Sequence, residues 1–130
     1  MSKPLRPPFK MHGGKAKLYP FIVGNFPADY QRMTYVEPFC GGANVLLNKE
    51  KSVLEVINDI DSDVMQIYRA IRDEPREFVK RLKATPYTLE TFQDALKRNK
   101  LPFDDYLDHA RNEFILRRMS RGGLKKNFAW

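Results

Sequence analysis

The sequence contains few of the residues that build disulfides or metal centres. It has one cysteine, Cys40, and two histidines, His12 and His109, among 130 residues. A single cysteine excludes an internal disulfide and fits a reducing compartment. The histidines lie far apart in the sequence, and no group of residues has the spacing of metal ligands, so we expect no metal site.

Long apolar runs are also missing. No stretch approaches the roughly 20 apolar residues that a membrane-spanning helix needs. The basic start, M-S-K-P-L-R-P-P-F-K, lacks the apolar core of a secretion signal. We therefore expect a soluble, cytoplasmic protein that binds no membrane.

Positive charge is in excess. The 23 lysines and arginines outnumber the 16 acidic residues, which gives a formal net charge of +7 and a pI near 9.6. This excess favours a polyanionic partner, and nucleic acid is the first candidate. A generally basic protein without such a partner has the same composition, so charge alone does not decide between the two.

The most informative stretch is residues 34–61, T-Y-V-E-P-F-C-G-G-A-N-V-L-L-N-K-E-K-S-V-L-E-V-I-N-D-I-D. A short β-type run leads into a Pro-Phe-Cys-Gly-Gly turn, an apolar helical stretch follows, and a second β-type run ends at Asn58-Asp59. This order of strand, glycine turn, helix, strand and acid is typical of a nucleotide-type cofactor site. The sequence therefore predicts a cofactor, with Asp59 as the carboxylate that binds a ribose.

The glycine turn narrows the kind of ligand. It lacks the three spaced glycines of a dinucleotide site, so it suits a smaller anion, such as a carboxylate, better than a pyrophosphate. Asp59 has an alternative role as the N-cap of the next helix. Lys15, after Gly13-Gly14, is a cation that can pair with an anion, although such a lysine is more often a solvated surface residue. We expect Cys40 to serve packing, since no histidine is placed to activate it.

The remainder of the chain has helical periodicity. We expect a short helix at residues 19–23, a helix capped by Asp61 or Ser62, one starting at Glu74-Pro75, one capped by Thr88, and one over residues 103–119. The basic end, S-R-G-G-L-K-K-N-F-A-W, fits a loop that follows a phosphate backbone or stacks on a base. The alternative, which we prefer in the absence of a partner, is a frayed terminus.

Together these motifs resemble the adenine-specific DNA methyltransferases of the deoxyadenosine methylase type. The resemblance is carried by K-M-H-G-G-K, E-P-F-C-G-G-A-N-V and I-N-D-I-D, in that order, and by the last seventeen residues, which are similar to the end of the family's target-recognition region. It implies S-adenosylmethionine as cofactor. The implied cofactor-binding positions are Met11, Lys15, Pro38, Phe39, Gly41, Gly42 and Asp59.

The resemblance also implies a fold and a division of the chain. The expected fold is α/β, an incomplete Rossmann-like S-adenosylmethionine-dependent methyltransferase fold with a helical insertion resembling a target-recognition region. Residues 1–72 would form the cofactor-binding part and residues 73–130 the DNA-reading part. The implied DNA contacts are Arg117, Arg118, Arg121, Lys125 and Lys126.

Two departures from the family pattern qualify this interpretation. Ala43 stands where many members have a third glycine. The catalytic D-P-P-Y motif, which follows the target-recognition region in the family, is absent, and Arg6-Pro7-Pro8-Phe9 has an arginine where an acceptor is needed. We therefore expect a truncated or split adenine methyltransferase, inactive alone and completed by a second chain. The alternatives are a catalytically silent module that binds nucleic acid or the cofactor, and a basic helical DNA-binding protein with a chance glycine turn.

Overall fold

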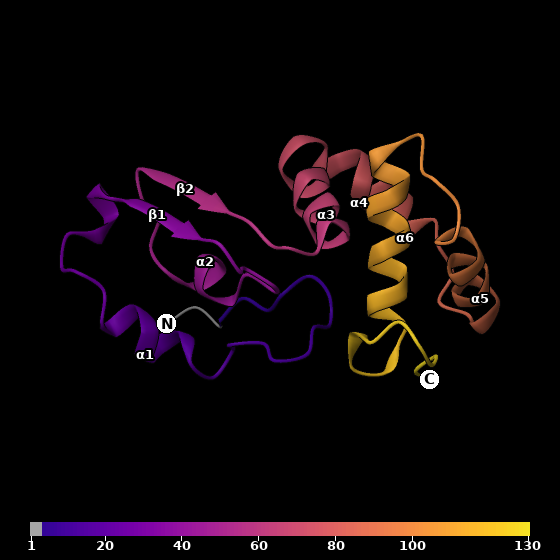
Figure 1. Ribbon diagram of the computed structural model, residues 1–130, viewed down its shortest axis with the longest axis horizontal. Coiled ribbons are helices and arrows are strands. Elements are labelled where there is room, and N and C mark those ends of the chain that lie inside the picture. Colours follow the sequence, from indigo (N-terminus) through magenta and orange to yellow (C-terminus); the bar gives the residue numbers. More distant parts are fainter. Residues whose placement is uncertain (1–3) are drawn as a thin grey trace. The chain divides into compact units, whose positions relative to one another are not determined.

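The computed structural model describes residues 4–130 and has mixed α/β architecture. Its contacts divide the chain into two compact units, shown in Figure 1. Unit 1 contains residues 13–60 together with the start of the chain up to Pro8, and unit 2 contains Phe9–His12 and Asp61–Trp130. The division after Ile60 assigns the first long helix to unit 2, whereas the sequence suggested a boundary after residue 72.

Unit 1 is built around a parallel pair of strands. β1 (Thr34–Glu37) pairs in parallel with β2 (Leu54–Ile57), and the described residues contribute these two strands to the sheet. The connection between them contains the short helix α2 (Asn44–Asn48). Before β1 come helix α1 (Tyr19–Gly24) and the 3-10 turn η1 (Tyr30–Arg32). The two strands and the short helix thus follow the order that the sequence predicts, although neither strand exceeds four residues.

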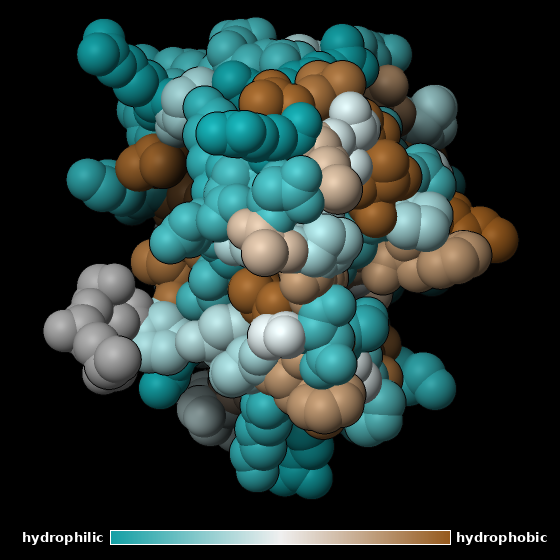
Figure 2. Space-filling view, turned by 90° about the vertical axis from the view of Figure 1, so that its left-hand side faces the viewer, coloured by the Kyte–Doolittle hydropathy of each residue, from teal (hydrophilic) through white to brown (hydrophobic). Residues whose placement is uncertain are grey.

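The two faces of this sheet have different surroundings. Because successive side chains alternate between faces, the register places Tyr35 and Glu37 on one face with Glu55 and Ile57 of β2. The opposite face carries Thr34, Val36, Leu54 and Val56, whose apolar members are 57%, 56% and 43% exposed respectively. Apolar side chains also reach the surface viewed in Figure 2. Parallel strands are normally covered on both faces, so this exposed apolar face is unusual.

A buried lysine, Lys49, lies against the sheet face that carries Tyr35 and Glu55. The Lys49 ammonium is fully buried and binds the Glu55 carboxylate, the Ser52 hydroxyl and the Glu50 carbonyl oxygen. It also lies 4.4 Å from the centre of the Tyr35 ring. A buried ammonium is tolerated only when it is paired and hydrogen-bonded, and these contacts satisfy that requirement. Lys49 therefore serves the packing of unit 1.

Unit 2 consists of four helices, all of which the sequence predicts. They are α3 (Ser62–Asp73), α4 (Pro75–Lys83), α5 (Leu89–Arg98) and α6 (Tyr106–Arg118). Asp61 caps α3 by accepting hydrogen bonds from the amides of Asp63 and Val64, and Thr88 caps α5. α6 packs against α3, α4 and α5, so it is the central helix of this unit.

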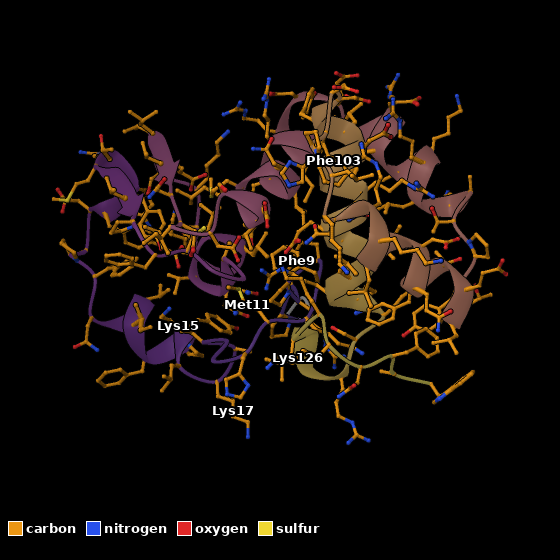
Figure 3. The ribbon with its side chains drawn as sticks, turned by 45° about the vertical axis from the view of Figure 1, so that its right-hand side comes forward. Phe9, Met11, Lys15, Lys17, Phe103 and Lys126 are labelled. Carbon is orange, nitrogen blue, oxygen red and sulfur yellow. The ribbon has the colours of Figure 1, made fainter. Side chains whose placement is uncertain are left out.

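The core of unit 2 includes a residue from near the start of the chain. Phe9 is 2% exposed and joins Val64, Ile67, Phe78 and Leu107 in one apolar cluster. Figure 3 labels Phe9 and Met11, which packs against the same cluster. A second cluster between α5 and α6 contains Phe92, Ile115 and Leu116. The proline-rich start of the chain therefore leads directly into a core residue.

The end of the chain is hydrogen-bonded to the end of α6. After α6 comes the 3-10 turn η2 (Arg121–Gly123), and Ser120 forms an antiparallel bridge with Phe128. The Arg121 amide donates to the Asn127 carbonyl oxygen and the Ala129 amide to that of Met119, at 2.9 and 2.8 Å. The sequence favoured a frayed terminus, but the structure has this bridge instead. The bridge pairs residues eight positions apart, and helical or strand periodicity does not indicate such a pairing. In the described part of the chain, no helix has the length and apolar character needed to cross a bilayer.

Two glycines allow a direct test of the packing of Lys10 against η2. At Gly123 (φ +73°), an added Cβ would lie 2.1 Å from the Lys10 carbonyl oxygen, whereas at Gly13 (φ +74°) it would meet nothing within 4 Å. We expect Gly13→Ala to cost about 1 kcal/mol through backbone strain alone. Gly123→Ala should cost about 3 kcal/mol or more, because a clash is added. Denaturant unfolding followed by circular dichroism measures both, and equal costs would contradict the close packing of Lys10.

Candidate functional site

The glycine turn (residues 38–43) is attached to the end of β2. The Asn58 amide donates to the Glu37 carbonyl oxygen and the Cys40 amide to that of Asn58, both at 2.9 Å. The Gly41 amide donates to Oδ2 of Asp59 at 2.8 Å. Since parallel strands end at the same edge of a sheet, these bonds bring together the turn after β1 and the acid after β2. The two elements that the sequence predicts as one site are therefore adjacent.

Asp59 does not cap the following helix. That role belongs to Asp61, whose side chain accepts the first amides of α3. The alternative that the sequence left open for Asp59 is thus excluded. Its carboxylate instead orients toward the backbone of the glycine turn.

The turn uses left-handed backbone at two positions. Gly41 has φ +48° and Ala43 has φ +50°. Left-handed backbone costs a non-glycine residue about 1 kcal/mol, so Ala43 is held in a conformation that a glycine would adopt more easily. Gly42 is buried, and a Cβ there would lie 3.1 Å from the ring of Pro7. Gly42 therefore contacts the start of the chain, and Gly41 is the more accessible glycine of the turn.

Three charges surround the Cys40 thiol at the centre of the turn. Burial raises its pKa to about 11, with further contributions from the carboxylates of Asp59 and Glu37, while the Lys15 ammonium acts in the opposite direction. Glu37 is 9% exposed and accepts a hydrogen bond from the Tyr35 hydroxyl at 2.8 Å. Burial and this bond raise the pKa of Tyr35. Glu37, which the sequence analysis did not select, thus contributes to the charge around the glycine turn.

One acceptor in the turn has no partner within the described residues. Asn44 is 4% exposed, and its Oδ1 is a buried side-chain oxygen without a hydrogen bond there. Buried polar atoms are nearly always satisfied, so this oxygen calls for a donor from a ligand or solvent. Asn44 directly follows the glycine turn. The polar residue at the end of Gly-Gly-Ala-Asn is the feature of the sequence that could have identified it as a candidate site residue.

The other predicted cofactor positions have different surroundings. Phe39 is 74% exposed, and the Pro38 carbonyl oxygen accepts a bond from the Asn58 side chain at 3.4 Å. Lys15 is exposed, and Figure 3 labels it in unit 1. Met11 belongs to unit 2, where it packs on the core. The structure thus places Gly41, Gly42, Asp59 and Lys15 in unit 1, and Met11 in unit 2, where it packs on the core.

The predicted DNA-binding residues fall into two groups. Arg117 and Lys125 form ion pairs inside unit 2. Arg117 binds Glu113 and Asp61, both at 2.6 Å, and Lys125 binds Glu113 at 3.0 Å. Arg118, Arg121 and Lys126, which we call the basic edge, are exposed. The first pair neutralises the fully buried Glu113, and the basic edge presents its charge to solvent.

The same network accounts for a cluster of carboxylates. Oxygen atoms of Asp61, Asp63 and Glu113 lie within 4.8 Å of one another. Arg117 and Lys125 contact this cluster, and His109 lies 2.9 Å from Asp63. The protein's own cations therefore counter the charge that a metal ion would otherwise balance, and we assign the cluster to packing.

Comparison with known proteins supplies the family. The profile of the D12 class N6 adenine-specific DNA methyltransferases matches residues 12–118. The chain belongs to this family. A type II methyltransferase of Lactococcus lactis subsp. cremoris is 36% identical over 80 residues, which are 60% of this chain and 26% of that protein. A type II methyltransferase of Methanocaldococcus jannaschii is 29% identical over 86 residues, or 62% and 30%.

The matched segments thus span less than a third of these relatives. The membership confirms the resemblance found in the sequence. It extends across both units, since the matched residues reach the last turn of α6.

The raised pKa of Cys40 predicts slow thiol chemistry. With a pKa of about 11, only about one thiol in a thousand is ionised at pH 8, and thiolate is the reactive form. We expect alkylation by iodoacetamide at pH 8 to be at least 100-fold slower in the folded chain than in guanidinium, and to accelerate between pH 8 and pH 11. Mass spectrometry of the modified protein measures both rates. Rapid labelling of the folded chain at pH 7 would contradict the assignment.

Proposed function

We propose that this chain is the cofactor-binding and partly DNA-binding portion of an adenine methyltransferase that uses S-adenosylmethionine. The observation that carries the proposal is the hydrogen bond from the Gly41 amide to Asp59, which joins the glycine turn to the acid. On this proposal the sheet of unit 1 is the start of a Rossmann-like methyltransferase fold. The single free cysteine fits action in a reducing cytoplasm.

The residues of the turn fit the chemistry of S-adenosylmethionine. Asp59 would accept hydrogen bonds from the ribose hydroxyls. The carboxylates of Asp59 and Glu37 favour a cationic ligand, which suits a sulfonium. The unpaired Oδ1 of Asn44 is an acceptor of the kind that an α-ammonium group requires. When bound, the cofactor supplies the methyl group, while the residues of this chain bind it and hold it in place.

The basic edge would contact DNA. Arg118, Arg121 and Lys126 are exposed cations at the end of α6, and phosphate contacts by such residues give sequence-independent affinity. Transfer to the exocyclic amino group requires the adenine to leave the duplex. Arg117 and Lys125 would act indirectly, by holding Glu113 and the turn that carries the basic edge.

The acceptor side of the reaction would come from residues outside this sequence. The exposed face formed by Thr34, Val36, Leu54 and Val56 is the kind of surface that further strands and helices cover in a complete parallel sheet. The relatives are several times longer than the segments that match. A segment carrying D-P-P-Y would accept hydrogen bonds from the adenine amino group and align its lone pair with the methyl group.

Substitutions of Asp59 test the cofactor site. Asp59→Ala removes the ribose acceptors and the bond to Gly41, so we expect S-adenosylmethionine affinity to fall by about 100-fold. Asp59→Asn retains an oxygen for the Gly41 amide but loses the charge, and an intermediate loss is expected. Isothermal titration calorimetry measures both, with the exposed Asp29→Ala as control. Equal affinity of wild type and Asp59→Ala would remove Asp59 from the site.

A methyl-transfer assay tests the proposed division of labour. The isolated chain should transfer no methyl group to adenine-containing DNA, because the acceptor motif is absent from it. Adding the product of a neighbouring reading frame that carries D-P-P-Y should restore transfer of labelled methyl. Transfer by the isolated chain would contradict the split arrangement. Cofactor binding without transfer in the mixture would favour the silent module.

A further inference from the structure

Trp130 is an exposed aromatic residue on a fixed segment. It is 97% exposed, although large aromatic side chains normally bury much of their surface. The backbone before it is paired with the end of α6 through the Ser120–Phe128 bridge and the bond from the Ala129 amide to the Met119 carbonyl oxygen. The indole is therefore presented to solvent by an ordered stretch of chain.

Other aromatic side chains support this segment. Phe128 meets Trp130 edge to face at a centroid distance of 4.9 Å and contacts Phe92, which is 2% exposed. The ring of Phe128 also lies 5.7 Å from that of Tyr87. The Tyr87 hydroxyl donates to the Ala129 carbonyl oxygen at 3.1 Å. The buried Phe92 ring and the half-exposed Tyr87 ring thus contact Phe128, whose ring meets the exposed indole.

The basic edge adjoins the same segment. The Tyr87 hydroxyl also lies 3.5 Å from the Arg118 carbonyl oxygen, so Arg118 and Ala129 are held by one side chain. The Arg121 amide bonds to Asn127. Hydrogen bonds to backbone atoms thus tie the segment that ends in Trp130 to the residues that carry two of the exposed cations. An exposed aromatic ring together with exposed cations is the combination that binds unpaired nucleic acid, since the ring stacks on a base while the cations contact phosphates.

We propose that Trp130 is a stacking site for an unpaired nucleobase of DNA. This inference rests on the proposed DNA-binding function and adds to it a residue that reads unstacked bases. Removing an adenine from the duplex leaves unpaired bases near the protein, and a fully paired duplex offers none. Trp130 therefore makes the chain prefer distorted DNA, and the basic edge binds both forms.

Tryptophan fluorescence gives a direct readout, because Trp130 is the single tryptophan of the chain. The probes are two DNA duplexes of the same length, one fully paired and one with an extrahelical adenine. We expect the second to quench the indole emission more strongly. In fluorescence anisotropy with labelled DNA, Trp130→Ala should lose about five- to 100-fold in affinity for the duplex with the extrahelical base. Trp130→Phe should recover part of that loss.

Control variants separate this inference from the function on which it rests. Phe21, on α1, is 73% exposed, and Phe21→Ala should leave both affinities unchanged. Arg121→Ala should weaken binding to both duplexes. If Arg121→Ala has this effect but Trp130→Ala has none and the emission is not quenched, the stacking site is wrong and the DNA-binding function stands. If the wild-type chain binds neither duplex, both are wrong.

Discussion

The hydrogen bonding of the two parallel strands continues beyond Glu37 and Ile57, and the proposed cofactor site depends on this continuation. Asn58 pairs with Glu37 and Cys40, and Asp59 then accepts the Gly41 amide. A turn and an acid that are far apart in the sequence are thereby held together by main-chain bonds. Main-chain pairing holds them at a fixed separation, as a site that orients a methyl donor requires.

Charge burial organises unit 2 in a comparable way. Glu113 is fully buried and is neutralised by Arg117 and Lys125, which reach it from α6 and from the turn that follows. Leaving any one of these charges unpaired inside the protein would be costly. The network therefore fixes the turn after α6, and that turn determines which cations remain exposed. The acidic residues of unit 2 thus pair with two of the cations, and the cations of the basic edge stay exposed to solvent.

The exposed sheet face links the structure to the comparisons. Members of this family that match the chain are much longer than the matched segments, and the sheet has an apolar face with 43–57% exposed side chains. Burying such a face is favourable, at roughly 25 cal/mol per Å² of apolar surface. Residues that cover this face would gain this stabilisation. The same face would favour self-association of the isolated chain.

The sequence by itself determined the local elements. Thr88, and Asp61 or Ser62, marked helix starts, and the β-type runs marked β1 and β2, because capping and periodicity are short-range effects. Only the tertiary structure decided that Gly42 is covered by Pro7, that Arg117 is buried while Arg118 is exposed, and that the last residues pair with α6. Burial and ion pairing depend on contacts between residues distant in the sequence, which no local pattern encodes.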